Sequence, residues 1–386
     1  MSDPVMDAQR RFPNVHWIWA GGISFVYEVH PRIVVKVPKS GEYEREQFHR
    51  ETKIYEIFSQ HSPCCSVVQC FFHTDNGIFL EYMRDGSLSS RIQNNQAKDQ
   101  QTMIVTKVEK LEPLFLRKKW MNDLAQAVAF LESLGLAHGD LRPENVLLDR
   151  DRLKLSDFDC TAKLGEDFEA CVAPYGRLLN SSEMNYGRPG TSGFLSSRTE
   201  LFALGSLYYL INYGFEVYGD RSLTEDPKEH GPKLVELLQN KEYPTLDSNP
   251  MIDDIISKCW HNNYATVAEL AAHTDIVLHQ GTYRENSNEG TVSSTTGWGV
   301  AMIVSRIIHG LWRSLAKWRW LVRRENNDNL INSIKTDGDS CEVLNQDSKT
   351  ATCKDLVRCG LLDLLSSGEP GQLGFQVEWY RHSYQV

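Results

Sequence analysis

The sequence predicts an α+β fold with two lobes, a small β-rich lobe followed by a larger helical lobe, and a C-terminal helical extension. Residues 15–37 combine aromatic and β-branched residues with glycine, which is typical of strands. Residues 118–135 and 199–214 carry apolar residues at helical spacing. The 386 residues suffice for both lobes and an appendage.

The remaining elements follow in order along the chain. Residues 42–58 have apolar side chains on one helical face, and residues 66–72 and 77–83 have the composition of strands. The polar residues 94–101 predict a loop or an insertion. The helices expected in the second lobe are residues 118–135, 199–214 and 253–260.

These patterns divide the chain into five parts. The small lobe spans residues 15–83, and the larger lobe spans residues 84–275. A polar linker rich in glycine, serine and threonine follows at residues 276–296. Residues 297–324 predict a basic amphipathic helix, and residues 325–386 predict a polar linker with a short helical tail, LVRCGLLDLLSSGEP, at residues 356–370.

Composition excludes several classes of protein. Acidic residues outnumber basic ones by 51 to 41, which argues against a nucleic-acid binder with a basic face. The nine cysteines show no paired CxxC, so no structural zinc site is expected. The start, MSDPVMDAQRRF, lacks an apolar signal core, and no membrane-spanning helix is predicted. We therefore expect an intracellular, cytoplasmic protein.

The chemistry concentrates in residues 138–159, HGDLRPENVLLDRDRLKLSDFD. The apolar runs VLL and LKL predict two short strands joined by a turn at DRD. Such a hairpin projects Asp140 and Asn145 from one loop and Asp157 from the next. Carboxylate and amide oxygens suit Mg²⁺, which bridges phosphates, and Asp140 remains free to accept a proton from a hydroxyl. The alternative is a helix and hairpin whose acids only cap turns.

This stretch resembles the eukaryotic protein kinase family. HGDLRPEN resembles the catalytic loop HRDLKPEN, and SDFD resembles the metal-binding DFG. The resemblance implies a kinase-like fold in which Asp140 orients the substrate hydroxyl and Asn145 and Asp157 hold Mg²⁺. Arg142 stands where a lysine steadies the γ-phosphate of ATP.

The resemblance extends into the small lobe. VVKVP resembles the strand whose lysine clamps the α- and β-phosphates, which makes Lys36 that residue. Its partner is expected on residues 42–58. Glu51 is the first choice there, and Glu44, Glu46 and Glu56 remain open because the register of a helix is not fixed by sequence.

The family also implies where the nucleotide binds. FLEYMRDGSL resembles the hinge between the lobes, with Leu80 behind the adenine and the backbone of Glu81 and Met83 bonding its edge. The later stretch DDIISKCW, followed by VAEL, resembles the helices that close the larger lobe. Gly21, Gly22 and Val26 complete the ATP-binding set that the resemblance implies.

The phosphate-covering loop departs from the family. When Val26 is aligned with the family valine, Trp19, Gly21 and Ser24 stand where GxGxxG has three glycines. Glycines let backbone amides approach phosphates closely. Gly21 and Gly22 keep part of that freedom, whereas Trp19 narrows the roof.

The larger lobe departs from the family as well. Gly139 replaces the arginine that pairs with a phosphorylated activation segment, and Asp159 replaces the glycine of DFG, which restricts its flip. APY at residues 173–175 lacks the glutamate of APE, and CWHNNYATVAEL lacks its arginine partner. Glu200 stands where an aspartate braces the catalytic loop.

The sequence therefore predicts an ATP- and Mg²⁺-dependent protein kinase, directed at serine or threonine of a protein substrate. A first alternative is a pseudokinase, a catalytically weak or inactive binding module, because the glycine loop is degenerate. A second is a small-molecule phosphotransferase of the aminoglycoside or choline kinase type, since those families also carry HGDxxxxN and Gly139 fits them.

Residues 297–324 raise the question of a membrane. Arg306, Arg313 and Lys317 on the charged face exclude a spanning helix. Peripheral binding at the membrane surface is one interpretation, with the tryptophans as anchors. The other is a helix that packs on its own domain, which we favour.

Overall fold

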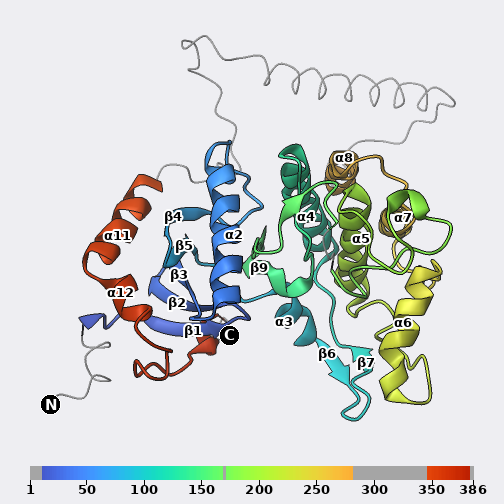
Figure 1. Ribbon diagram of the computed structural model, residues 1–386. Coiled ribbons are helices and arrows are strands. Elements are labelled where there is room, and N and C mark those ends of the chain that lie inside the picture. The colour runs from blue at the N-terminus through green and yellow to red at the C-terminus, as the bar shows by residue number, and fades with distance from the viewer. Residues whose placement is uncertain (1–10, 168–170, 281–345, 383–386) are drawn as a thin grey trace, which may run out of the picture. The chain divides into compact units, whose positions relative to one another are not determined.

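The computed structural model describes residues 11–167, 171–280 and 346–382. The small lobe is built on a five-stranded antiparallel sheet in the order β1-β2-β3-β5-β4 (Figure 1). Its strands are β1 (His16–Ala20), β2 (Ser24–His30), β3 (Ile33–Pro38), β4 (Cys70–Thr74) and β5 (Gly77–Glu81). The sequence IVVKVP of the central strand β3 is buried along its whole length. Lys36 is its one charged residue, and a buried charge requires partners.

Helices cover both faces of this sheet (Figure 1). Helix α2 (Glu42–Ser59) packs on one face through Phe48, Ile54 and Tyr55. Helices α11 (Gln346–Arg358) and α12 (Leu361–Leu365) pack on the other. The C-terminal segment therefore belongs to the small lobe, although it follows the larger lobe in sequence.

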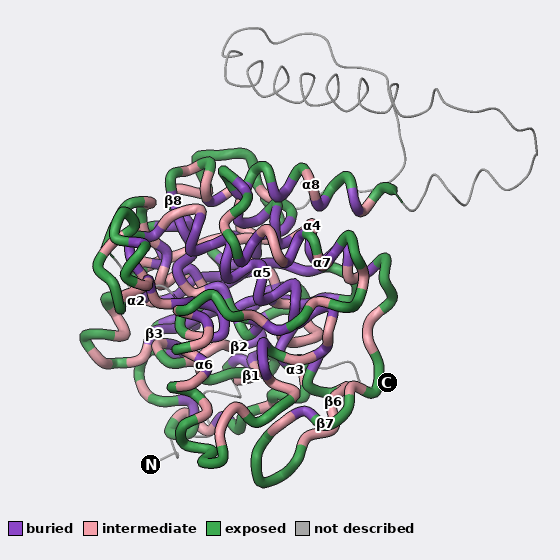
Figure 2. The backbone as a smooth tube through the Cα atoms, turned by 90° about the vertical axis from the view of Figure 1, so that its right-hand side faces the viewer, coloured by how far each residue is buried: buried purple, intermediate pink, exposed green. Residues whose placement is uncertain are grey.

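The second lobe is mainly helical. Its helices are α3 (Leu88–Gln93), α4 (Leu114–Ser133), α5 (Ser197–Tyr213), α6 (His230–Gln239), α7 (Pro250–Trp260) and α8 (Val267–His279). Helix α4 packs on α8, and α5 packs on α7. All residues 198–212 of α5 are buried, and Figure 2 shows this helix in the middle of the buried region. A helix that is enclosed on all sides in this way forms the core of its lobe.

Short strands and turns connect these helices. β8 (Leu136–Ala137) pairs with β11 (Ala162–Lys163), and β9 (Val146–Asp149) pairs with β10 (Arg152–Leu155). The 3₁₀ helices are η1 (Pro143–Asn145), η2 (Met184–Tyr186), η3 (Pro227–Glu229) and η5 (Trp379–His382).

Two local predictions were wrong. Residues 94–101 are not simply a loop, because β6 (Gln96–Lys98) and β7 (Val105–Val108) form a hairpin there. Asp99 accepts hydrogen bonds from the backbone of its turn, so polar side chains stabilise the hairpin. The C-terminal helix begins at Gln346, well before its expected start, and breaks at Gly360, whose φ is +79°.

The predicted α+β class with two lobes and a C-terminal helical extension is confirmed. The amphipathic helix predicted at residues 297–324 lies outside the described residues. Within the described ranges, every helix is too short or too polar to cross a bilayer.

Candidate active site

The buried lysine of β3 forms the first half of the site. Lys36 Nζ donates to Glu51 Oε2 of α2 at 2.6 Å and to Asp157 Oδ1 at 2.5 Å. These contacts satisfy a lysine that is only 7% exposed, since an unpaired buried charge is costly. Glu46, one of the alternatives left open by the sequence, instead pairs with Arg50 on the surface of the helix. The structure thus joins Lys36, Glu51 and Asp157.

The charges of this half are unbalanced. Burial alone would lower the pKa of Lys36, but Asp157 and Glu51 raise it above its usual value, so the lysine stays charged. Burial would raise the pKa of Asp157, and Lys36 brings it below its usual value. Burial raises the pKa of Glu51 to about 7 in spite of Lys36. Burial and repulsion from Asp157 also raise the pKa of Asp159. Three acids therefore share one lysine, which suits the addition of a metal cation.

The catalytic-loop residues form the second half. Asn145 Nδ2 donates to Asp140 Oδ2 at 2.9 Å, and Arg142 Nε pairs with the same oxygen at 3.0 Å. Cys171 Sγ donates to Asp140 Oδ1 at 3.5 Å. The Asp140 side chain keeps 21% of its surface exposed. It is thus held in place by its neighbours and still accessible to a hydroxyl group.

Backbone contacts position both loops. Ser156 donates to the Asn145 carbonyl through its N–H at 2.9 Å and its hydroxyl at 2.8 Å, directly before Asp157. The β9–β10 hairpin that the sequence predicts makes this possible, because it places Val146 opposite Leu155. The side chains of His138 and Glu200 hold the backbone of both loops in place. The ring of buried His138 contacts the Ser156 carbonyl at 3.0 Å, and the His138 N–H donates to Glu200 Oε2 at 2.7 Å.

The donor atoms fit a divalent cation such as Mg²⁺. The Nδ2 group of Asn145 donates to Asp140, and within the described residues no group donates to its Oδ1. Asp157 bonds Lys36 through only one of its two oxygens. The described ranges contain no cluster of three His, Cys, Asp or Glu residues that could hold a metal. Asn145 and Asp157 therefore suit an ion that takes its other ligands from phosphates and water, as Mg²⁺ does.

The turn between β1 and β2 lies at the end of the lysine strand. Val26 is the ladder partner of Lys36. The Gly21 N–H donates to the Ser24 carbonyl at 2.9 Å and closes the turn. A Cβ on Gly22 would meet nothing within 4 Å, so the turn is open at that residue. The side chain of Trp19 is 56% exposed at its edge.

The segment after β5 offers a backbone edge to a ligand. The Glu81 N–H donates to the Gln69 carbonyl at 2.8 Å, and its carboxylate pairs with Lys154 Nζ at 2.6 Å. Met83 is buried, and among the described residues neither its N–H nor its carbonyl has a backbone partner. Met83 therefore presents an unused donor and acceptor next to the sheet.

Two departures from the kinase pattern have a backbone cause. Gly139 has a φ of +79°, and a Cβ there would lie 2.5 Å from the Cys160 carbonyl oxygen. No arginine can stand at this position unless the backbone moves. In the stretch DFD the left-handed φ of 64° falls on Asp157, and Asp159 has no positive φ. Asp159 therefore replaces glycine without strain at its own backbone.

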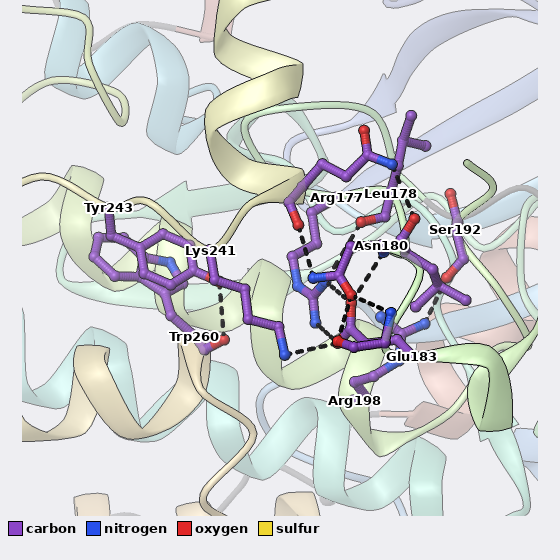
Figure 3. Close-up of polar contacts among 12 residues, drawn as sticks. Arg177, Leu178, Asn180, Glu183, Ser192, Arg198, Lys241, Tyr243 and Trp260 are labelled. Atoms are coloured by element: carbon purple, nitrogen blue, oxygen red, sulfur yellow. Dashed lines mark hydrogen bonds and ion pairs between the residues drawn. The ribbon is translucent and has the colours of Figure 1, made fainter. Parts of the chain in front are cut away.

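An ion pair that the sequence did not reveal lies in the segment before α5 (Figure 3). Arg177 donates from Nη1 and Nη2 to the two oxygens of Glu183 at 2.7 and 2.6 Å. Lys241 Nζ reaches Glu183 Oε1 at 3.1 Å from the end of α6. Both residues of the pair are buried. The sequence of the larger lobe lacks the APE glutamate and the arginine that form a buried salt bridge in the family, and the pair of Arg177 with Glu183 provides a different buried salt bridge. No motif spacing marks this pair in the sequence.

Comparisons with known proteins identify a family. The protein kinase domain matches residues 21–273, which is more than half of the chain. The chain is 24% identical over 241 residues to "Probable serine/threonine-protein kinase gdt2" of Dictyostelium discoideum, covering 60% of this chain and 13% of that protein. It is 26% identical over 185 residues to "CBL-interacting protein kinase 10" of Oryza sativa, covering 46% of this chain and 36% of that protein.

A third relative is "Maternal embryonic leucine zipper kinase" of Xenopus tropicalis. The identity is 32% over 152 residues, which cover 38% of this chain and 21% of that protein. The chain thus spans at most about a third of the length of these curated relatives.

Proposed function

The chain belongs to the protein kinase domain family, and we propose that it transfers the γ-phosphate of ATP, with Mg²⁺, to serine or threonine of a protein substrate. The observation that carries this proposal is the double contact of Lys36 with Glu51 and Asp157, at 2.6 and 2.5 Å. It ties the sheet, α2 and the segment after β10 into one site. The printed name of the Dictyostelium relative supports the serine/threonine class.

Each residue has a role that follows from its contacts. Lys36 is the fixed cation for the α- and β-phosphates, and Glu51 sets its direction. Mg²⁺ neutralises phosphate charge when it is bound, and Asn145 Oδ1 and Asp157 would hold it. Asp140 accepts the proton of the attacking hydroxyl, with Arg142 beside it to steady the transferred group.

A binding module without turnover is the competing function. The turn at Gly21 supports it, because tryptophan and serine occupy two of the three glycine positions of the family loop. Against it stand the preserved contacts of Lys36 and Asp140. Positioning and electrostatics supply nearly all of the catalysis in phosphoryl transfer. The preserved contacts therefore weigh more than the loop.

The test is phosphate transfer by the full chain, with ATP, Mg²⁺ and a generic basic protein. Asp140→Asn should lose at least about 100-fold in rate, the usual contribution of a positioned base, and should still bind ATP. Asp151→Asn is the matched control, because Asp151 lies exposed in the turn of the same hairpin.

Other outcomes select the alternatives. An Asp140→Asn rate equal to that of the unmodified chain would refute the mechanism. ATP binding without transfer by the unmodified chain would indicate a pseudokinase. Transfer to a small alcohol, with none to protein, would indicate the aminoglycoside or choline kinase type.

A further inference from the structure

The C-terminal segment, residues 346–382, completes the core of the small lobe. Its apolar side chains share one core cluster with the outer face of the sheet. Those of the segment are Cys353, Leu361, Leu362, Leu365 and Phe375, and those of the sheet include Tyr27, Val29, Val35 and Phe79. The ring of Phe375 lies edge-on to Tyr27 at 5.5 Å. This contact buries apolar surface on both sides and holds the segment on the lobe.

The end of the segment makes polar contacts of a different kind. The Arg381 guanidinium pairs with Glu28 of β2, Nε to Oε2 at 2.7 Å and Nη2 to Oε1 at 3.2 Å. The Tyr82 hydroxyl donates to the Arg381 carbonyl at 2.9 Å. The Glu378 N–H donates to the Trp17 carbonyl of β1 at 2.7 Å. We call this set of contacts the Arg381 latch.

The latch connects the parts of the small lobe that surround the proposed nucleotide site. Glu28 lies two residues beyond Val26, the ladder partner of Lys36. Tyr82 lies between Glu81 and Met83, the residues whose backbone is expected at the adenine edge from the resemblance of this stretch to the kinase hinge. Arg381, a residue of the C-terminal segment, therefore contacts both β2, which we call the roof strand, and Tyr82 of the hinge (residues 79–88).

We propose that Arg381 is a positioning residue for the nucleotide, and that its contacts with Glu28 and Tyr82 fix the spacing between the roof strand and the hinge. The inference rests on the proposed function, because it concerns the same nucleotide site. A bidentate guanidinium fits this task, since its planar fork fixes direction as well as distance, which the ammonium of a lysine does not. Nucleotide affinity therefore depends on a residue about 300 positions beyond the hinge.

The experiment compares four variants of the full chain. Arg381→Ala removes the guanidinium part of the latch, the pairing with Glu28, and leaves the Arg381 carbonyl in place for Tyr82. Arg381→Lys keeps the charge without the fork. Arg358→Ala is the matched control, because Arg358 belongs to the same segment but, among the residues that the structure describes, forms its ion pair with Asp355 of its own helix. Leu365→Ala weakens the apolar contact of the segment without touching the latch.

Two measurements are needed. The first is the KM for ATP, together with kcat and the KM for a peptide. The second is backbone hydrogen exchange at residues 24–30 and 80–84 without nucleotide, which requires no activity. Arg381→Ala should raise the KM for ATP about three- to tenfold, the effect of losing a charge-assisted hydrogen bond at a partly exposed site. It should leave kcat and the peptide KM unchanged. Exchange should speed up most at residues 24–30, where the Glu28 pairing is lost, and less at residues 80–84, because Tyr82 still donates to the Arg381 carbonyl.

The controls separate positioning from stability. Arg381→Lys should fall between Arg381→Ala and the unmodified chain, and Arg358→Ala should match the unmodified chain. Leu365→Ala should lower the melting temperature without changing the KM for ATP below that temperature. The proposal is overturned if Arg381→Ala leaves exchange unchanged, or if Leu365→Ala raises the KM for ATP equally. Faster exchange in a chain that transfers no phosphate would instead reject the proposed function and retain the latch.

Discussion

Glu183→Gln is expected to lower the free energy of unfolding strongly, at a position outside the proposed nucleotide site. Glu183 is 6% exposed, accepts two hydrogen bonds from Arg177 and forms an ion pair with Lys241. Glutamine keeps the size of the side chain but replaces one acceptor oxygen with a donor, which must face the guanidinium. One hydrogen bond becomes a repulsive contact, and a buried arginine loses its counter-charge.

The magnitude follows from the pKa of the carboxyl group. Burial alone would raise the pKa of Glu183, but Arg177 and Lys241 lower it to about 2. An ordinary glutamate has a pKa near 4.3, and each unit of difference is worth about 1.4 kcal/mol. Arg177, Lys241 and the Asn180 N–H together therefore stabilise the charged carboxylate by about 3 kcal/mol. Because the folded pKa is the lower one, this stability is complete above about pH 4.3 and is lost as the pH falls toward 2.

Urea denaturation of both chains measures this quantity. At pH 7 we expect the free energy of unfolding of Glu183→Gln to be lower by about 3 kcal/mol. The gap should narrow as the pH falls below about 4.3, since the unmodified chain then loses the same interaction. Glu236→Gln, which removes only a surface pair with Lys233, should cost less than about 1 kcal/mol. A loss below about 1 kcal/mol for Glu183→Gln, or a gap that does not change with pH, would refute the reasoning.

Two further predictions concern the catalytic loop. Gly139→Ala should lower the free energy of unfolding by about 2 kcal/mol or more, because its Cβ meets the Cys160 carbonyl at 2.5 Å in a left-handed backbone; a neutral result in urea denaturation would contradict this. Glu200→Gln should flatten the pH dependence of stability, since burial raises the pKa of Glu200 to about 7. The folded chain then keeps a proton that the unfolded chain releases above about pH 4.3, so stability of the unmodified chain falls as the pH rises to 7. Thermal denaturation across that range measures the slope, and an unchanged slope in the variant would exclude this role.

Local patterns made the centre of the site predictable. The spacing of Asp140, Asn145 and Asp157 around two apolar runs predicts a hairpin, and the hairpin forms with Val146 opposite Leu155. The partner of Lys36 was harder to predict from sequence, because the rotation of α2 against the sheet decides which glutamate points inward. That rotation depends on how Phe48 and its neighbours pack on the sheet, and no short stretch of sequence encodes it.

Contacts between distant residues explain most of what the sequence did not show. Helix α11 is polar, and of its thirteen residues only Cys353 is fully buried, so apolar periodicity marks it poorly. Its lysines contact aromatic rings of the sheet instead: Lys349 Nζ lies 4.8 Å from the ring centre of Phe71, and Lys354 lies over Phe72. Such cation–π contacts let charged residues cover an aromatic face. A pattern based on hydrophobicity alone reads the same residues as solvent-exposed linker.

Gly139 and the pair of Arg177 with Glu183 decide which charges this part of the larger lobe holds. The backbone at Gly139 admits no side chain, so the catalytic loop has no cation there to hold a phosphorylated segment. Arg177 lies in the segment before α5 and pairs with Glu183 of the same segment. With a pKa of about 2, that carboxylate is charged throughout the neutral range. Within the described part of this segment, the two buried charges therefore compensate each other.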